Sequence, residues 1–107
     1  MIQDRIAEIE ARLASADLPP ATRDELLALL ADLKTEVVKL ASAHDEQARS
    51  ITRSADAAIS LAAQPVENRA PDALQEFRAS VEGFEASHPR LVQIVDRIAL
   101  TLSNMGI

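Results

Sequence analysis

The two histidines of the chain are the residues whose spacing comes closest to a chemical site. His88 follows Glu85 by three positions, and Glu-x-x-His is the ligand pair that di-iron helical bundles use. Such a centre needs two of these pairs and two further glutamates, so a dimer would be required, with Glu82 or Glu46 as the completing ligand. The candidate metal ligands are therefore Glu85, His88 and His44.

A simpler interpretation explains the same residues without a metal. Single Glu-x-x-His pairs are common on helices, and motifs of this length also match by chance. In this interpretation His88 ends a helix in front of Pro89 and caps its carbonyls, while Glu85 faces water. We favour it, and we expect neither a metal nor a cofactor.

The remaining reactive side chains form no catalytic arrangement. The serines and threonines have only two histidines to serve as a base, and neither histidine lies in a nucleophile motif. The only glycines are Gly83 and Gly106, so no glycine-rich loop can bind phosphates. The absence of cysteine excludes thiolate nucleophiles, disulfides and cysteine-based zinc sites. The sequence predicts that the protein is not an enzyme.

The charge balance limits the kinds of partner. The chain has 11 basic and 17 acidic residues and a net charge of −6, with the basic residues scattered among carboxylates. Nucleic acids and anionic membranes both favour a basic face, so neither is an expected partner. No signal peptide is visible at the N-terminus, and no segment approaches the roughly 20 apolar residues of a membrane span. We expect a soluble cytoplasmic protein.

The elements that must position these residues are helices. Two Gly, two Phe and no Trp or Tyr argue against a sandwich or barrel. Apolar residues spaced by three and four residues predict a first helix over about 2–17, which Pro19 and Pro20 end. The residues of this stripe are Ile2, Ile6, Ile9, Leu13 and Ala16.

The same spacing continues without interruption through the middle of the chain. Thr22 and Glu25 are spaced as a capping box, and the stripe then runs from Leu26 to Leu61 with no Gly or Pro. This pattern predicts one long central helix over about 23–62, which would be about 60 Å long. The alternative is a break over residues 42–45, and we favour the unbroken helix because the stripe does not slip there.

A loop over 63–71 separates this helix from a C-terminal one over about 72–105, with Pro71 in its first turn. Pro89 lies inside the second segment. It either kinks one helix or separates two, with Ser87 as the cap of the second. The two alternatives stay open, although an unslipped stripe favours the kink.

The width of the apolar faces predicts how these helices assemble. The fold class is an all-α antiparallel bundle in a single domain, 1–107, with a three-helix end (2–41 plus 90–105) and a thin two-helix end (42–88). A bare helical pair buries too little apolar surface to offset its ordering entropy, so we expect a homodimer that forms a four-helix bundle. The expected interface residues are Ile51, Ile59, Leu74, Phe77, Val81 and Phe84.

Folding the long helix against the C-terminal one places His44, Gln47 and His88 at one level of the seam. A polar layer in an apolar bundle usually fixes register and oligomeric state at some cost in stability. We expect that role for these three residues, with a response to pH as the lesser alternative.

The C-terminal segment resembles a known family. The run Phe-Glu-Ala-Ser-His-Pro-Arg-Leu over residues 84–91, closed by Ser-Asn-Met-Gly-Ile over 103–107, resembles short bacterial proteins described as domain of unknown function 4404. The resemblance implies a small bacterial helical protein, and it brings no activity, cofactor or catalytic residue.

These observations favour a non-enzymatic, dimeric helical protein that acts by self-association and by binding another protein. The alternative is a metal- or small-ligand-binding bundle built around His44, Glu85 and His88.

Overall fold

The computed structural model describes residues 2–61 and 72–105, and these two segments form five helices. The helices are α1 (Ile2–Ser15), α2 (Pro20–Ala41), α3 (Asp45–Ser60), α4 (Asp72–Ala79) and α5 (Pro89–Asn104). No strand occurs in either segment, which confirms the all-α fold class. The predicted loop over 63–71, including Pro71, lies outside the described residues.

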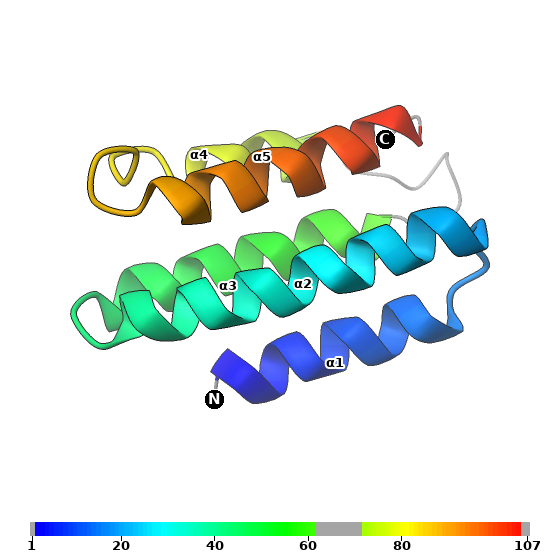
Figure 1. Ribbon diagram of the computed structural model, residues 1–107, viewed down its shortest axis with the longest axis horizontal. Helices are drawn as coiled ribbons and strands as arrows, with labels where there is room; N and C mark the ends of the chain where they lie inside the picture. The colour runs from blue at the N-terminus through cyan, green and yellow to red at the C-terminus, as the bar shows by residue number, and fades with distance from the viewer. Residues whose placement is uncertain (1, 62–71, 106–107) are drawn as a thin grey trace.

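The helices are arranged in three layers (Figure 1). An antiparallel hairpin of α2 and α3 forms the middle layer, and α1 packs against both of its helices on one side. On the other side α5 packs against α2, and α4 packs against α3. Helices α2 to α5 thus make a four-helix bundle within one chain, and α1 covers its outer face.

The core is built from the apolar stripes that the sequence predicts. In α1 the buried residues are Ile6, Ile9 and Leu13, at the spacing expected for one helical face. Phe77 of α4 is the largest fully buried side chain. The members of the core with no measurable exposure in α2 and α5 are Leu26, Leu30, Leu33, Val37, Leu40, Leu91, Val95, Ile98, Ala99 and Leu102.

The single long helix over 23–62 is wrong, and the alternative break is correct. Helix α2 ends at Ala41, the Leu40 carbonyl accepts the N–H groups of Ala43 and His44 at 3.1 and 2.8 Å, and α3 begins at Asp45. A hairpin lets the leucine-rich face of α2 bury itself against the stripe of α3, which a straight helix cannot do within one chain. The longest dimension of the molecule is accordingly 37 Å, well short of 60 Å.

The C-terminal segment over 72–105 is likewise two helices and not one kinked helix. Helix α4 ends at Ala79, a turn over 80–88 follows, and Pro89 occupies the first turn of α5. Gly83 adopts a φ of 95°, a left-handed conformation that costs glycine little. The cap of α5 is His88 and not Ser87.

The start of α2 also differs from the expected capping box. The helix begins at Pro20, where a missing N–H costs nothing, and Arg23 donates its N–H to the Pro19 carbonyl at 3.0 Å. Thr22 and Glu25 therefore lie inside the helix, and no side chain caps its N-terminus.

Because of these two turns, the apolar faces of the helices are buried against one another within one chain. The described residues of 42–88 do not form a thin two-helix end, because α3 and α4 pack in the same bundle as α2 and α5. The accessible surface is 5983 Å², close to the roughly 5,800 Å² expected for a monomer of this mass. The apolar faces that were expected to need a second copy are therefore buried within one chain.

No helix in the described segments is both long enough and apolar enough to span a membrane.

Candidate functional site

The two histidines lie at the end of the bundle where both inter-helix turns meet. Phe84, in the turn before α5, lies between His44 and His88, with each imidazole 5.9 Å from its ring centroid in an edge-on arrangement. Both histidines precede a helix, and each donates its backbone N–H to the carbonyl four residues earlier, at 2.8 Å for His44 and 2.7 Å for His88. His44 thus helps to end α2, and the carbonyls of His44 and His88 accept the N–H groups of Ala48 in α3 and Val92 in α5.

This cluster is not the buried polar layer that the sequence predicts. His44 and Gln47 are exposed, and His88 is half-buried. The layer required a continuous helix through His44, and the turn there moves the side chain to the end of the bundle.

The candidate metal ligands are not arranged as a helical pair either. Glu85 and His88 lie in a turn, so they lack the one-turn spacing on a helical face that a di-iron ligand pair needs. The Glu85 carboxylate instead accepts the Gly83 N–H at 2.8 Å. Within residues 2–61 and 72–105, no three His, Asp or Glu side chains are grouped closely enough to hold a metal ion.

The six expected interface residues belong mainly to the core of one chain. Ile51, Ile59, Phe77 and Val81 are buried, with at most 3% of each residue exposed. Leu74 and Phe84 are half-buried and pack against the same core. The buried four cannot contact another molecule in the folded chain, because the seam that they were expected to expose is closed by the chain itself.

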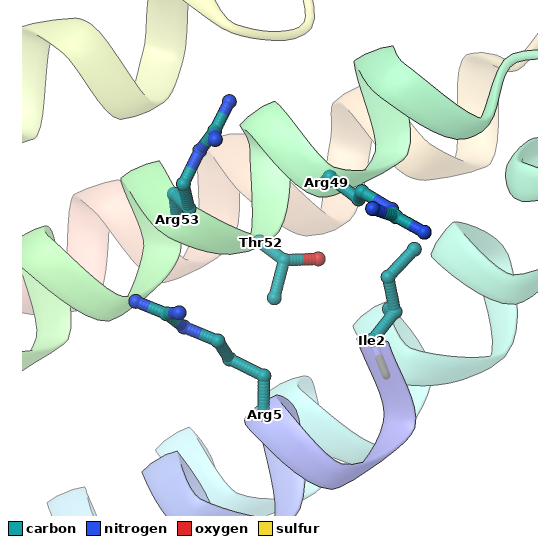
Figure 2. Close-up of a pocket in the computed structure, with 5 residues that line it drawn as sticks. All are labelled: Ile2, Arg5, Arg49, Thr52 and Arg53. Atoms are coloured by element: carbon teal, nitrogen blue, oxygen red, sulfur yellow. The ribbon is translucent and has the colours of Figure 1, made fainter.

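A different surface, formed by α1 and α3, collects positive charge. Arg5 of α1 and Arg49, Thr52 and Arg53 of α3 line a hollow of about 270 Å³ together with Ile2 (Figure 2). Thr52 lies between the arginines and is 2% exposed, and its hydroxyl donates to the Ala48 carbonyl at 2.9 Å. No carboxylate is among the described residues that line this arginine hollow.

The guanidinium groups of the arginine hollow are only partly neutralised. The Nε of Arg49 is 3.0 Å from the Asp45 carboxylate, in an exposed pair on one helical face. Arg53 has no ion-pair partner in the part of the chain that the structure describes. Its side chain points toward α4, away from Arg5 and Thr52 (Figure 2).

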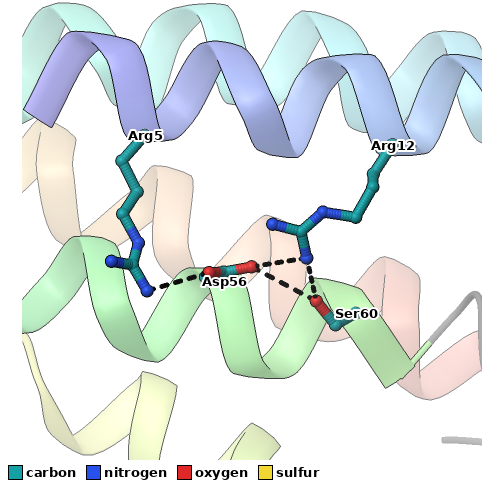
Figure 3. Close-up of polar contacts among 4 residues, drawn as sticks. All are labelled: Arg5, Arg12, Asp56 and Ser60. Atoms are coloured by element: carbon teal, nitrogen blue, oxygen red, sulfur yellow. Dashed lines mark hydrogen bonds and ion pairs between the residues drawn. The ribbon is translucent and has the colours of Figure 1, made fainter.

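The third arginine is fixed by a carboxylate that bridges α1 and α3. Asp56 accepts Arg5 at 3.1 Å and Arg12 at 2.9 Å, and Arg12 also donates to the Ser60 hydroxyl at 2.7 Å (Figure 3). The Asp56 side chain is 16% exposed, against 49% for Arg5 and 51% for Arg12. This network holds α1 in register along α3 and so positions Arg5 at the hollow.

A second hollow adjoins the first and is mainly apolar. It has a volume of about 240 Å³ and is lined by Ile2, Gln3, Val38, Ala41, Asp45 and Arg49. Ile2 and Arg49 line both hollows, so the two lie next to each other. Helix α1 begins short of the α2–α3 turn (Figure 1).

Only part of this surface can be recognised from the sequence. Arg49 and Arg53 are four residues apart, which places them on one face of a helix. Arg5 is 44 residues away from Arg49, and only the packing of α1 on α3 brings it to the same hollow. Val38 belongs to the leucine-rich segment, yet 37% of it is exposed, at the hollow that it lines together with Ile2.

Comparison with known proteins identifies a family but no activity. No curated protein and no solved structure shows significant similarity to the chain. A family model described as Domain of unknown function (DUF4404) matches residues 26–107, which begin inside α2 and include α3, α4 and α5. This match covers the four-helix bundle and most of the chain, and the protein therefore belongs to the DUF4404 family.

Proposed function

We propose that the protein is a non-enzymatic helical module that acts by binding another protein. The observation that supports this most directly is the hollow beside the end of the α2–α3 hairpin. Val38 and Ala41 line an apolar hollow there, on a molecule whose other large apolar side chains are mostly buried. Apolar side chains grouped in a surface hollow with a polar rim are typical of binding sites.

A photo-crosslinking amino acid at position 38, in the organism that encodes the protein, tests this proposal. We expect one adduct of discrete mass, and we expect Ala41→Glu in the same chain to abolish it, because an unpaired charge in an apolar contact is costly. The matched control places the crosslinker at Arg78, which is exposed on α4 and lines neither hollow. Absence of an adduct at position 38, or equal adducts at both positions, would contradict the proposal.

The alternative of a metal-binding bundle is tested separately. Elemental analysis of protein purified without chelator should find no stoichiometric metal. His44, Glu85 and His88 do not form a group of three ligands in the described part of the chain. One bound metal per chain or per two chains would reverse the ranking of the two functions.

A further inference from the structure

We propose that α1 is an exchangeable helix, and that the groove it occupies on the α2–α3 hairpin also takes α1 of a second copy of this chain. In the resulting dimer each chain places its α1 on the hairpin of the other, so the contacts of α1 within one chain are repeated between two chains. This exchange is independent of the hollow at Val38. It takes place on a surface whose occupant is seen in place (Figure 1).

The contact between α1 and the hairpin has the composition of an interface between two proteins. Its centre is formed by Ile6, Ile9 and Leu13, each of which is at most 2% exposed. Its rim is charged, and among the described residues every ion pair that joins two helices includes a residue of α1. An apolar centre with a polar rim is typical of surfaces that bind a separate chain.

The ion pairs set the position of α1 along the hairpin. Asp56 of α3 accepts Arg5 and Arg12, which are about two helical turns apart on α1 (Figure 3). On the α2 side, the Lys34 ammonium lies 3.6 Å from the Glu10 carboxylate. A helix that binds here needs two cations and a carboxylate at these positions beside its apolar stripe, and α1 of a second copy has all of them.

The two surfaces match by position and not by net charge. Asp4 and Glu8 flank the arginines on α1, and Arg53 lies three residues before Asp56 on α3, so both signs of charge occur on both sides of the contact. Asp4, Glu8 and Arg53 are exposed and form no ion pair with a described residue. Recognition therefore depends on which residues face each other, and an identical chain reproduces that arrangement.

Helix α1 can leave the hairpin while the four-helix bundle stays closed. It packs on α2 and α3 from outside the bundle, on the side away from α4 and α5 (Figure 1). Residues 16–19 join it to α2, so this linker is the segment that must change conformation.

The linker is short and partly extended. The Leu18 N–H donates to the Ala16 carbonyl at 3.0 Å, and the Arg23 guanidinium reaches the same carbonyl at 3.5 Å. Pro19 has a φ of −55° and a ψ of 135°, close to polyproline geometry, and the residue before a proline also favours an extended backbone. Short hinge loops with a restricted backbone favour domain exchange.

Protein concentration decides between the two states, because the same contacts form in both. A helix on a short linker is present at its own groove at an effective concentration of about 1 mM, so a second copy competes with it only near that concentration. The unaltered chain is therefore a monomer at micromolar concentration and exchanges α1 where copies are concentrated to about 1 mM.

Two complementary variants test the exchange in full-length protein. Arg5→Glu/Arg12→Glu brings two carboxylates of α1 to Asp56, and Asp56→Arg brings a third guanidinium group to Arg5 and Arg12, so each variant alone has a mismatched α1. In an equimolar mixture, each α1 finds a matched groove on the other chain. One partly exposed ion pair changes an equilibrium constant by up to about fivefold, so restoring the pairs on both chains should lower the dissociation constant about a hundredfold, to about 10 µM.

Light scattering of the mixture at about 100 µM should give a mass near twice that of one chain, whereas each variant alone should give the mass of one chain. The matched control mixes Arg5→Glu/Arg12→Glu with Asp45→Arg, because Asp45 pairs with Arg49 on its own helix. The control mixture should stay monomeric. A monomeric test mixture, or equal masses in both mixtures, would overturn the exchange.

Deletion of residues 16–18 tests the exchange without altering the groove. One residue then remains between α1 and α2, fewer than the roughly two residues of the shortest helical hairpins, so α1 cannot fold back on its own chain. The variant should be a dimer at micromolar concentration, with isotope-filtered NMR contacts between the α1 methyl groups of one chain and α3 of the other. A folded monomer, or a dimer whose contacts lie outside α1, would overturn the exchange whatever crosslinking at position 38 shows about a partner.

Discussion

At the scale of single residues, Asp56 is the side chain on which the α1–α3 contact depends most. It accepts from Arg5 and Arg12 together, and it is far less exposed than either arginine. Asp56→Asn should lower the free energy of unfolding by about 1 kcal/mol, the upper range for a partly exposed ion pair, because both arginines lose their charged partner. Urea unfolding followed by circular dichroism measures the change.

Asp45→Asn provides the matched control for that loss. Asp45 pairs with one exposed arginine on its own helix, so its loss should cost only about 0.3–0.5 kcal/mol. The difference between the two variants should narrow at high salt, since screening weakens both pairs. Equal effects would show that Asp56 does not connect α1 to α3 energetically.

Truncation of the two phenylalanines should lower the stability by very different amounts, although both are expected interface residues. Phe77 is 0% exposed, and Phe77→Ala should cost about 3–5 kcal/mol because it leaves a cavity in the core. Phe84 is half-buried between two histidines, so Phe84→Ala should cost about half as much or less. Thermal unfolding of both variants compares them, and a greater loss for Phe84 would contradict the assigned burial.

The buried residues of α1 could be read from the sequence, because burial there follows helical periodicity. Ile6, Ile9 and Leu13 lie where the spacing of three and four predicts. At α3 the predicted stripe included His44 and Gln47, which are exposed, and missed Ala48 and Thr52, which are buried. The arginine hollow could not be read in this way, since Arg5 reaches Arg53 only through the packing of α1 on α3. Periodicity describes one helix at a time and contains no information on which charged faces meet.

At the scale of helices, the same periodicity could not reveal where α2 ends. The stripe runs through residues 42–44 without a slip, so it does not mark the turn. The hairpin is favoured by packing, because the apolar face of α2 then meets α3, α5 and α1 within one chain. The local signals for a break were weak ones, a serine and a histidine of modest helix propensity ahead of two acidic residues.

Helix α1 should behave as a separable layer of the fold. It contacts α2 and α3 and lies before the segment that matches the DUF4404 family model. Ile9→Ala removes a side chain that is 1% exposed and should cost about 2–4 kcal/mol. Hydrogen exchange should then accelerate in α1 while α5 keeps its protection, as expected for local opening. Uniform acceleration across all helices would show that α1 and the bundle unfold together.

At the scale of the whole molecule, the hairpin fold favours a monomer at micromolar concentration. One chain closes the four-helix bundle by itself, and its apolar stripes are buried there. Light scattering should therefore give a mass near 11.6 kDa. A mass twice as large would restore the homodimer that the sequence suggests, formed through a surface other than the buried seam.

The unbroken stripe also predicts how a dimer could be made deliberately. Replacing Ser42 by Glu and His44 by Leu favours a continuous helix through the turn, because both changes raise helix propensity and position 44 regains an apolar residue on the stripe. A straightened α2–α3 segment cannot fold back on itself, so α3, α4 and α5 of one chain would pack against α1 and α2 of another, as in domain swapping. Light scattering of S42E/H44L should then show a mass near twice that of the single chain, increasing with concentration.

The single variant S42E leaves His44 in the turn and should remain monomeric. If the double variant also stays monomeric with full helicity, packing of the hairpin outweighs local propensity at the turn.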